Sequence, residues 1–199
     1  MAQLEIMARP REFDPQAALQ TAIQVFWEKG YANTSVGEIV KRSGVAKYGI
    51  YGTFGNKEEL FKQVLAQYAR DRHQDIQRPI RQPGASLPEI RAFFAEAPKL
   101  MTQEGYLHGC LICNTGIELG LRDPEIRNFV NNFFGDIARV LQRCLVRAVE
   151  KGELETPKDI IGMASYLATE FRTALMLARS GYSRQDIEQH LEIALQVLQ

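Results

Sequence analysis

Residues 35–60 read SVGEIVKRSGVAKYGIYGTFGNKEEL, and this stretch decides the fold. Its spacing predicts two short helices joined at Ser43-Gly44-Val45, followed at once by the start of a third. Ser35 with Glu38 three residues later is a capping-box pattern, which predicts the start of the first helix. The second short helix is expected over about residues 46–54. Together they form the pattern of a helix-turn-helix, whose second helix enters the DNA major groove.

The second short helix is expected to bury Ile50 and Phe54 and to turn its polar and aromatic residues outward. Lys47 lies in the first turn, where side chains contact phosphate or base edges. Tyr51, one turn later, can donate its hydroxyl to a phosphate oxygen. The candidates for base contacts, including contact with a thymine methyl, are Tyr48 and Thr53. The alternative is that these are solvated surface side chains.

Other candidate phosphate contacts lie at helix starts, where hydroxyls, backbone N–H groups and positive charge favour anions. They are Thr34, Ser35 and Lys57. Arg9 and Arg11 belong to an expected N-terminal arm, which can reach the backbone or a minor groove.

An amphipathic helix is expected upstream, over Pro15–Lys29, and a long helix downstream from Lys57. Three prolines within residues 78–88 then interrupt the helical pattern, which is typical of a joint between domains. We therefore expect a small N-terminal domain over residues 9–61 and a larger one over residues 62–199.

Capping signals and apolar spacing predict that the second domain is helical throughout, and no strand signals are present. The first expected helix follows Ser86-Glu89 and ends at about residue 100, and the second spans residues 110–121. The third begins at Asp123-Pro124 and ends before Gly152, and the fourth runs from Thr156-Pro157 to Gly181. The last starts at Ser183, with Asp186 in its first turn. The fold class is therefore predicted to be all-α.

A spaced set of residues closely resembles the DNA-binding domain of the tetracycline-repressor (TetR) family of bacterial regulators. The set is Phe26, Gly30-Tyr31, Thr34-Ser35-Val36, Ile39, Gly44-Val45, Lys47, Ile50-Tyr51, Phe54 and Lys57-Glu58-Glu59-Leu60. The resemblance implies a homodimer joined through the last two helices of each partner, double-stranded operator DNA as a partner, and a small effector bound in the second domain.

The sequence departs from the family pattern inside the second short helix. Ala46 stands where Ser or Thr usually caps the helix, and Tyr48 stands where a small residue is usual. Gly49 and Gly52 are poor helix formers. A helix that is soft in the absence of DNA is therefore expected.

The composition restricts the class of protein. Lys plus Arg and Asp plus Glu number 24 each, so no global basic field indicates nucleic acid, although local donors suffice to hold phosphates. Neither a run of 18 apolar residues nor a signal-peptide core is present, so we expect a cytoplasmic protein without membrane contact. The three cysteines are expected to be reduced. We expect no cofactor and no enzymatic activity.

The segment around Cys110 and Cys113, with His108 nearby, leaves three alternatives open. The cysteines can be small buried core residues. They can be reactive thiols, because a helix N-terminus lowers the pKa of a thiol. They can also join His108 and Cys144 in a metal site, although their spacing is not an established metal-binding pattern. Residues 109–119 resemble a TetR subgroup in which some members sense electrophiles or oxidants through cysteine.

The effector pocket is expected between the helices of the second domain and is expected to be mostly apolar. Its candidate lining residues are Phe93, Phe94, Tyr106, Cys113, Asn114, Ile117, Phe133, Phe134, Tyr166, Phe171 and Met176, with Glu118 and Arg172 as further polar groups. Most aromatic residues at helical spacing belong to a core, so only some of these are expected to line a pocket.

These observations predict a homodimeric, ligand-responsive transcriptional regulator that acts as a repressor, binds operator DNA through the helix-turn-helix and is released by a small, mostly apolar effector. The alternatives are a thiol-responsive regulator acting through Cys110 and Cys113, a thiol redox enzyme using the same residues, and a helical adaptor that does not bind DNA.

Overall fold

The computed structural model describes residues 13–103, 108–155 and 159–199. All secondary structure in these ranges is helical, which confirms the predicted all-α class. The helices are α1 (Pro15–Lys29), α2 (Val36–Ser43), α3 (Lys47–Phe54), α4 (Lys57–Asp75), α5 (Arg78–Arg81), α6 (Leu87–Met101), α7 (Leu111–Leu119), α8 (Pro124–Glu150), α9 (Ile160–Arg179) and α10 (Arg184–Ala194), followed by the 3₁₀ turn η2 (Leu195–Leu198).

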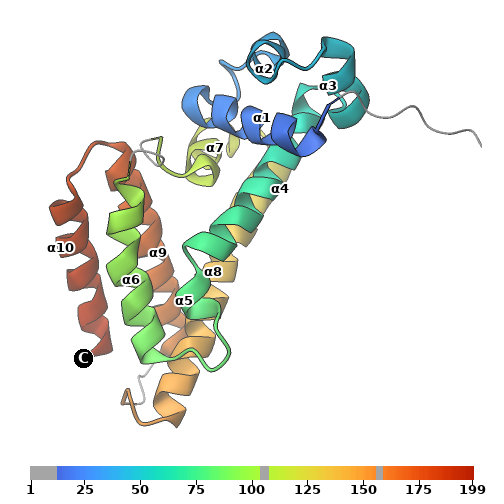
Figure 1. The fold of residues 1–199 in the computed structure, drawn as a ribbon. Helices are drawn as coiled ribbons and strands as arrows, with labels where there is room; N and C mark the ends of the chain where they lie inside the picture. The colour runs from blue at the N-terminus through green and yellow to red at the C-terminus, as the bar shows by residue number, and fades with distance from the viewer. Residues whose placement is uncertain (1–12, 104–107, 156–158) are drawn as a thin grey trace, which may run out of the picture.

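Helices α1, α2 and α3 form a small unit at one end of the molecule (Figure 1). Each helix contributes fully or nearly fully buried apolar side chains, among them Phe26, Ile39 and Ile50. The ring of Phe26 meets that of Phe61 on α4 at 4.8 Å between centroids. The apolar stripe of each short helix therefore packs on its neighbours, and burial of this kind stabilises short helices that would be marginal alone.

Local capping sets the ends of these helices. The side chain of Asp14 accepts a hydrogen bond from the Gln16 N–H at the start of α1. The turn between α2 and α3 depends on Gly44, which has φ of 70° in the left-handed region that favours glycine. Asn56 and Glu59 form a reciprocal capping box at the start of α4.

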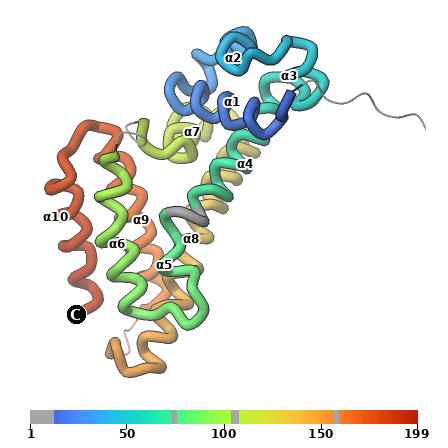
Figure 2. Tube along the Cα trace, in the orientation of Figure 1, coloured from blue at the N-terminus to red at the C-terminus, as the bar shows by residue number. Residues whose placement is uncertain are grey.

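Helix α4 leads from the small unit into the rest of the molecule, where α6, α8, α9 and α10 form a bundle (Figures 1 and 2). Helix α7 lies between α1 and the bundle. Lys62 on α4 pairs with Glu125 on α8 at 2.8 Å, beside its pair with Glu58 at 2.9 Å. The small unit is thus held to the bundle through α4 and, as described below, through α7.

The structure corrects several of the expected helix boundaries. The proline-rich segment 78–88 contains α5, because Pro79 is tolerated in the first turn of a helix. Helix α7 is shorter than residues 110–121. Helix α9 begins at Ile160 with Asp159 as its cap, whereas the expected start at Thr156-Pro157 lies outside the described residues.

The capping box expected at Ser35 is only half formed. The Ser35 hydroxyl accepts a hydrogen bond from the Glu38 N–H. The carboxylate of Glu38 instead pairs with Lys29 at 2.6 Å and with Arg42 at 3.5 Å. Contact with a neighbouring helix thus replaces the local bond that the sequence pattern predicted. The division into residues 9–61 and 62–199 stays a prediction, since α4 runs without a break across it.

No helix among the described residues is both long and apolar enough to span a bilayer.

Candidate nucleic-acid interface and effector cavity

Helix α3 turns one face into the small unit and the other outward. Ile50 and Phe54 are buried, whereas Tyr48 is 72% exposed and Tyr51 is 42% exposed. The ammonium group of Lys47 lies 5.8 Å from the centroid of the Tyr51 ring, so the two side chains share one side of the helix. Thr53 is half-buried. The outward face therefore offers a cation and phenolic hydroxyls within one turn of each other.

The two glycines of α3 differ in their surroundings. A Cβ on Gly49 would lie 3.0 Å from the Phe13 ring and 3.2 Å from a Val45 methyl carbon. A Cβ on Gly52 would meet nothing within 4 Å. Gly49 thus lets Phe13 pack closely against α3, which the sequence reading missed. Gly52 leaves the outward face open.

The candidate phosphate contacts outside α3 are placed differently from one another. Thr34 is buried, and its hydroxyl donates to the Gly30 carbonyl at 2.7 Å, so this hydroxyl points inward. Ser35 is exposed but caps α2. The Lys57 ammonium lies 4.4 Å from the centroid of the Tyr31 ring. Arg9 and Arg11 lie outside the described residues.

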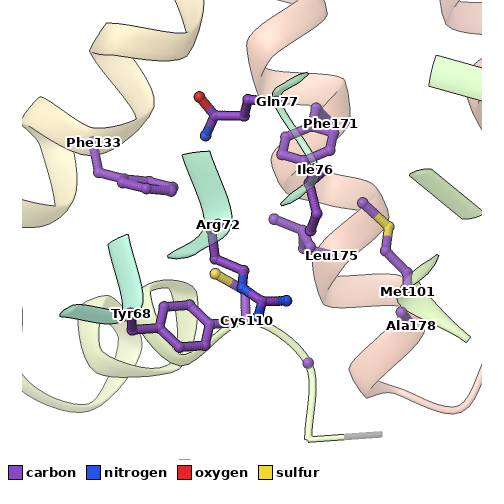
Figure 3. Close-up of a pocket in the computed structure, with 11 residues that line it drawn as sticks. Tyr68, Arg72, Ile76, Gln77, Met101, Cys110, Phe133, Phe171, Leu175 and Ala178 are labelled. Atoms are coloured by element: carbon purple, nitrogen blue, oxygen red, sulfur yellow. The ribbon is translucent and has the colours of Figure 1, made fainter. Parts of the chain in front are cut away.

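A narrow cavity of about 20 Å³ lies inside the larger part of the molecule and is partly open to solvent. Figure 3 shows Tyr68, Arg72 and Cys110 close together, with Phe171 and Leu175 of α9 among the other lining residues. The complete lining is Tyr68, Arg72, Ile76, Gln77, Met101, Gly109, Cys110, Phe133, Phe171, Leu175 and Ala178. Most of the wall is apolar, which is typical of sites for small organic ligands.

The cavity includes part of the pocket expected from the sequence. Phe133 and Phe171 line it, and so does Cys110. Other expected residues do not line it: Phe93, Phe94 and Cys113 are buried in the core, Phe134 lies beneath the Arg172 guanidinium, Asn114 donates to the His108 carbonyl, and Ile117, Tyr166 and Met176 are exposed. Tyr106 lies outside the described residues.

Helix α4 also lines the cavity, a contribution that was not predicted from the sequence. Tyr68, Arg72 and Ile76 recur at steps of four, so they share one helix face. The Arg72 guanidinium carbon lies 5.1 Å from the centroid of the Tyr68 ring. That spacing was visible in the sequence, but the face that α4 presents to the bundle was not.

Cys110 is the N-cap residue of α7 and is both buried and part of the cavity wall. The hydrogen bond from the Cys113 thiol lowers the pKa of Cys110 to about 7, and backbone N–H groups in the first turn of α7 add to this effect. The same pairing raises the pKa of Cys113, as does its burial. Cys110 therefore has the more nucleophilic sulfur of the two near neutral pH.

Cys144 lies apart from that pair, on α8. Its thiol donates to the Ile80 carbonyl at 3.4 Å, and burial raises its pKa. In the part of the chain that the structure describes, no group of three or more His, Cys, Asp or Glu side chains is placed to hold a metal ion.

Helix α7 contacts α1 near both of its ends. The indole N–H of Trp27 donates to the Gly109 carbonyl at 2.7 Å. At the other end, the Glu118 carboxylate accepts from the backbone N–H groups of Tyr31 at 2.9 Å and Ala32 at 2.7 Å. Glu118 was expected to be a polar group of the pocket, but in the structure it joins α7 to the small unit.

A small helical unit with an outward-facing second helix, joined to a larger helical bundle, has the architecture of a helix-turn-helix regulator. Residues 18–64 match the bacterial regulatory proteins of the tetR family, and residues 86–193 match the tetracyclin repressor-like C-terminal domain. The chain belongs to the TetR family of transcriptional regulators.

Relatives and solved structures share the whole plan of the chain. The HTH-type transcriptional regulator YezE of Bacillus subtilis (strain 168) is 28% identical over 96% of this chain and 100% of its own length. The HTH-type transcriptional repressor ComR of Escherichia coli (strain K12) is 28% identical over 91% of this chain and 87% of its own. A cysteine mutant of the TetR regulator CifR, solved with 26-bp operator DNA, has a TM-score of 0.85 at 23% identity and covers 96% of this chain and 100% of its own.

Proposed function

We propose that this chain is a homodimeric repressor that binds operator DNA through α3 and releases it when a small, mostly apolar effector enters the cavity. The observation that carries the proposal is the outward face of α3, where Lys47, Tyr48 and Tyr51 stand clear of the core. Because phosphate and base contacts need donors and aromatic groups on one helix face, this face suits the major groove. Such a protein would act in the cytoplasm.

The exposed apolar side chains of the last helices support a homodimer. Ile161 and Met176 on α9 are 67% and 45% exposed, and Ile193 on α10 is 55% exposed. Tyr166 and Val197 are further exposed apolar side chains of the same helices and of η2. Since two-fold dimers are the commonest oligomers, a second copy packing on this face would bury these side chains.

The dimer would set the spacing of the two α3 helices. They must lie about 34–36 Å apart to enter successive major grooves, so a small rotation of either subunit's small unit (α1–α3) weakens DNA binding. In free-energy terms the effector acts through its preference for the conformation with the wrong spacing.

The experiment that tests DNA binding is a fluorescence-anisotropy titration on the DNA flanking the protein's own coding region. Lys47→Ala and Tyr51→Ala are expected to weaken binding roughly tenfold each, as lost contacts of about 1–3 kcal/mol would. The matched control is Lys99→Ala, because Lys99 is an exposed lysine of α6 outside the helix-turn-helix. Full-strength binding by both α3 variants would contradict the role of α3, whereas no binding by the wild-type protein would favour a helical adaptor.

Cys110 supports a second candidate function, a regulator that responds to electrophiles or oxidants. Its sulfur lies at the start of α7 and in the wall of the cavity, so a reagent that enters the cavity meets it directly. We expect N-ethylmaleimide or diamide to release DNA from the wild-type protein. The Cys110→Ser variant should keep its DNA, whereas Cys144→Ser should respond as the wild type does. Release from Cys110→Ser would contradict the sensor role.

The rival hypothesis of a thiol redox enzyme makes a separate prediction, which is turnover in a disulfide-reduction assay that Cys110→Ser abolishes. We expect no turnover above that of free thiols, because the pair lies inside a regulator fold rather than in a βαβ unit.

A further inference from the structure

Helix α7 is a short bridge between the cavity and the DNA-binding unit. Its N-cap residue Cys110 and the preceding Gly109 both line the cavity. Its last turn carries Glu118, which holds the backbone of the turn that follows α1. The nine-residue helix α7, together with the two residues that precede it, therefore connects the cavity wall at one end to the small unit at the other.

The cavity end is also tied to α1. The Trp27 indole donates to the Gly109 carbonyl, and its ring lies edge-on to the Tyr68 ring at 5.5 Å between centroids. Since Tyr68 also lines the cavity, Trp27 is in contact with two parts of its wall. A change in the position of Gly109 must either move Trp27 or break a buried hydrogen bond.

Gly109 has little room to move away from α1, toward α9. Its φ is 69°, and a Cβ there would lie 2.7 Å from the Cβ of Arg179 on α9. The Arg179 guanidinium donates to the His108 carbonyl next to it. The segment before α7 is thus held against α9, so displacement by a cavity occupant is directed toward α1.

The far end makes the tighter connection. Glu118 accepts two backbone N–H bonds, one from Tyr31 and one from Ala32, and such charge-assisted bonds are short and strong. Gly30, with φ of 78°, permits this approach, because a Cβ there would lie 2.8 Å from a Glu118 oxygen. Both anchors of α7 therefore fall on the last turn of α1 and the residues just after it.

We propose that Trp27 and Glu118 are positioning residues that convert occupancy of the cavity into a tilt of the DNA-binding unit, with α7 as the rigid element between them. This inference rests on the proposed function for its DNA readout. It differs from a route through α4 alone, because it predicts that the two α1–α7 contacts carry the response.

The test uses Cys110→Phe as a built-in occupant, so that no effector needs to be known. This variant enlarges a side chain in the cavity wall and is expected to weaken DNA binding roughly tenfold, within the usual range of allosteric coupling. In the Glu118→Gln background the same substitution should change affinity less than threefold, because the two N–H groups bond to separate carboxylate oxygens and glutamine replaces one of these oxygens with a donor NH2 group. The matched control is Glu188→Gln, whose carboxylate pairs within α10 with Arg184 at 2.6 Å. In that background the full effect of Cys110→Phe should remain.

Two outcomes would overturn the proposal. One is an unchanged DNA affinity in Cys110→Phe, checked by circular dichroism for a folded protein. The other is an equal loss in the Glu118→Gln and Glu188→Gln backgrounds, which would assign the coupling to α4. If Cys110→Phe does not fold, Cys110→Met is a smaller built-in occupant, and the same two outcomes of its DNA-binding measurements would overturn the proposal.

A DNA-independent measurement separates this proposal from the proposed function. Hydrogen exchange at the Tyr31 and Ala32 amides should speed up about tenfold in Cys110→Phe and be fast in Glu118→Gln regardless of the occupant. If wild-type protein binds no DNA, the proposed function fails, and these two amides still decide the coupling. No acceleration in Cys110→Phe would contradict it.

Discussion

Trp27 and Gly109 lie 82 positions apart in the sequence, and the indole N–H of the first donates to the buried carbonyl of the second. This bond joins the helix-turn-helix unit to the segment that opens α7. The same tryptophan packs against Tyr68 on α4. The Trp27 side chain therefore contacts both α4 and the segment before α7, which connect the small unit to the bundle.

Replacing Trp27 with Phe should destabilise the protein by at least about 2 kcal/mol, because a buried carbonyl loses its donor and the smaller ring leaves space. Urea unfolding measures the loss. The control is Tyr182→Phe, which changes an exposed ring and is expected within about 0.5 kcal/mol of wild type. A loss as small as the control's would show that another donor or water replaces the indole.

The two glycines of α3 should respond oppositely to alanine. Gly52→Ala is expected to stabilise the protein by up to about 1 kcal/mol, since the added methyl meets nothing and alanine favours helix. Gly49→Ala is expected to destabilise the protein. The added methyl overlaps with Phe13 and Val45, and this overlap costs about 1–3 kcal/mol, which outweighs the gain in helix propensity. Thermal melts of both variants decide the point, and equal melting temperatures would contradict the close packing of Phe13.

Ala46 occupies the N-cap of α3 without a side-chain hydrogen bond. Ala46→Ser should therefore stabilise the protein by about 1 kcal/mol, because a serine hydroxyl at the N-cap can accept a hydrogen bond from a backbone N–H in the first turn. Urea unfolding tests this, and the control is Ala95→Ser at an exposed position of α6. Serine inside a helix is slightly unfavourable, so the control should move in the other direction.

Alkylation of Cys110 should depend on pH with a midpoint near neutrality. The Cys113 thiol lowers the pKa of Cys110 to about 7, and the thiolate is the reacting form, so the rate rises as pH passes through that value. Cys113→Ala removes the donor, and the midpoint should move upward toward about 8.5. Mass spectrometry of the maleimide adduct against time gives the rates. A midpoint that stays in place would show that the Cys113 thiol does not stabilise the thiolate.

Salt should reveal the role of Lys47 in DNA binding. A phosphate contact releases counterions, so Lys47→Ala should reduce the slope of log K against log salt by about 1. Affinity measured at several salt concentrations gives this slope, and Lys99→Ala should leave it unchanged. A slope that did not change in Lys47→Ala would mean that its ammonium contacts no phosphate.

Local features of the sequence predicted the helices well. Helix α1 begins and ends at Pro15 and Lys29 as expected, because capping and apolar spacing are decided within a few residues. Ser183 and Asp186 form the expected box at the start of α10. The outward side of α3 also follows from spacing alone, once Ile50 and Phe54 are taken as buried.

Contacts between distant residues were not predictable in the same way. Glu118 looked like a polar group of the pocket because it stands among apolar residues of α7. In the structure it instead satisfies two backbone N–H groups beyond the end of α1. Nothing near residue 118 in the sequence indicates that turn. The cavity was predicted only in part for the same reason, since α4 contributes a face whose orientation depends on packing.

Helix α3 separates the positions that hold the fold from those on the face proposed to bind DNA. Gly49 and Ile50 are fixed by their neighbours, whereas Tyr48, Tyr51 and Gly52 face outward. Under the proposed function, substitutions on the outward side change which operator is preferred while the domain keeps its stability. Duplicated copies of such a gene can diverge toward new promoters through single substitutions, and the same positions are the natural place to randomise when redesigning the target sequence.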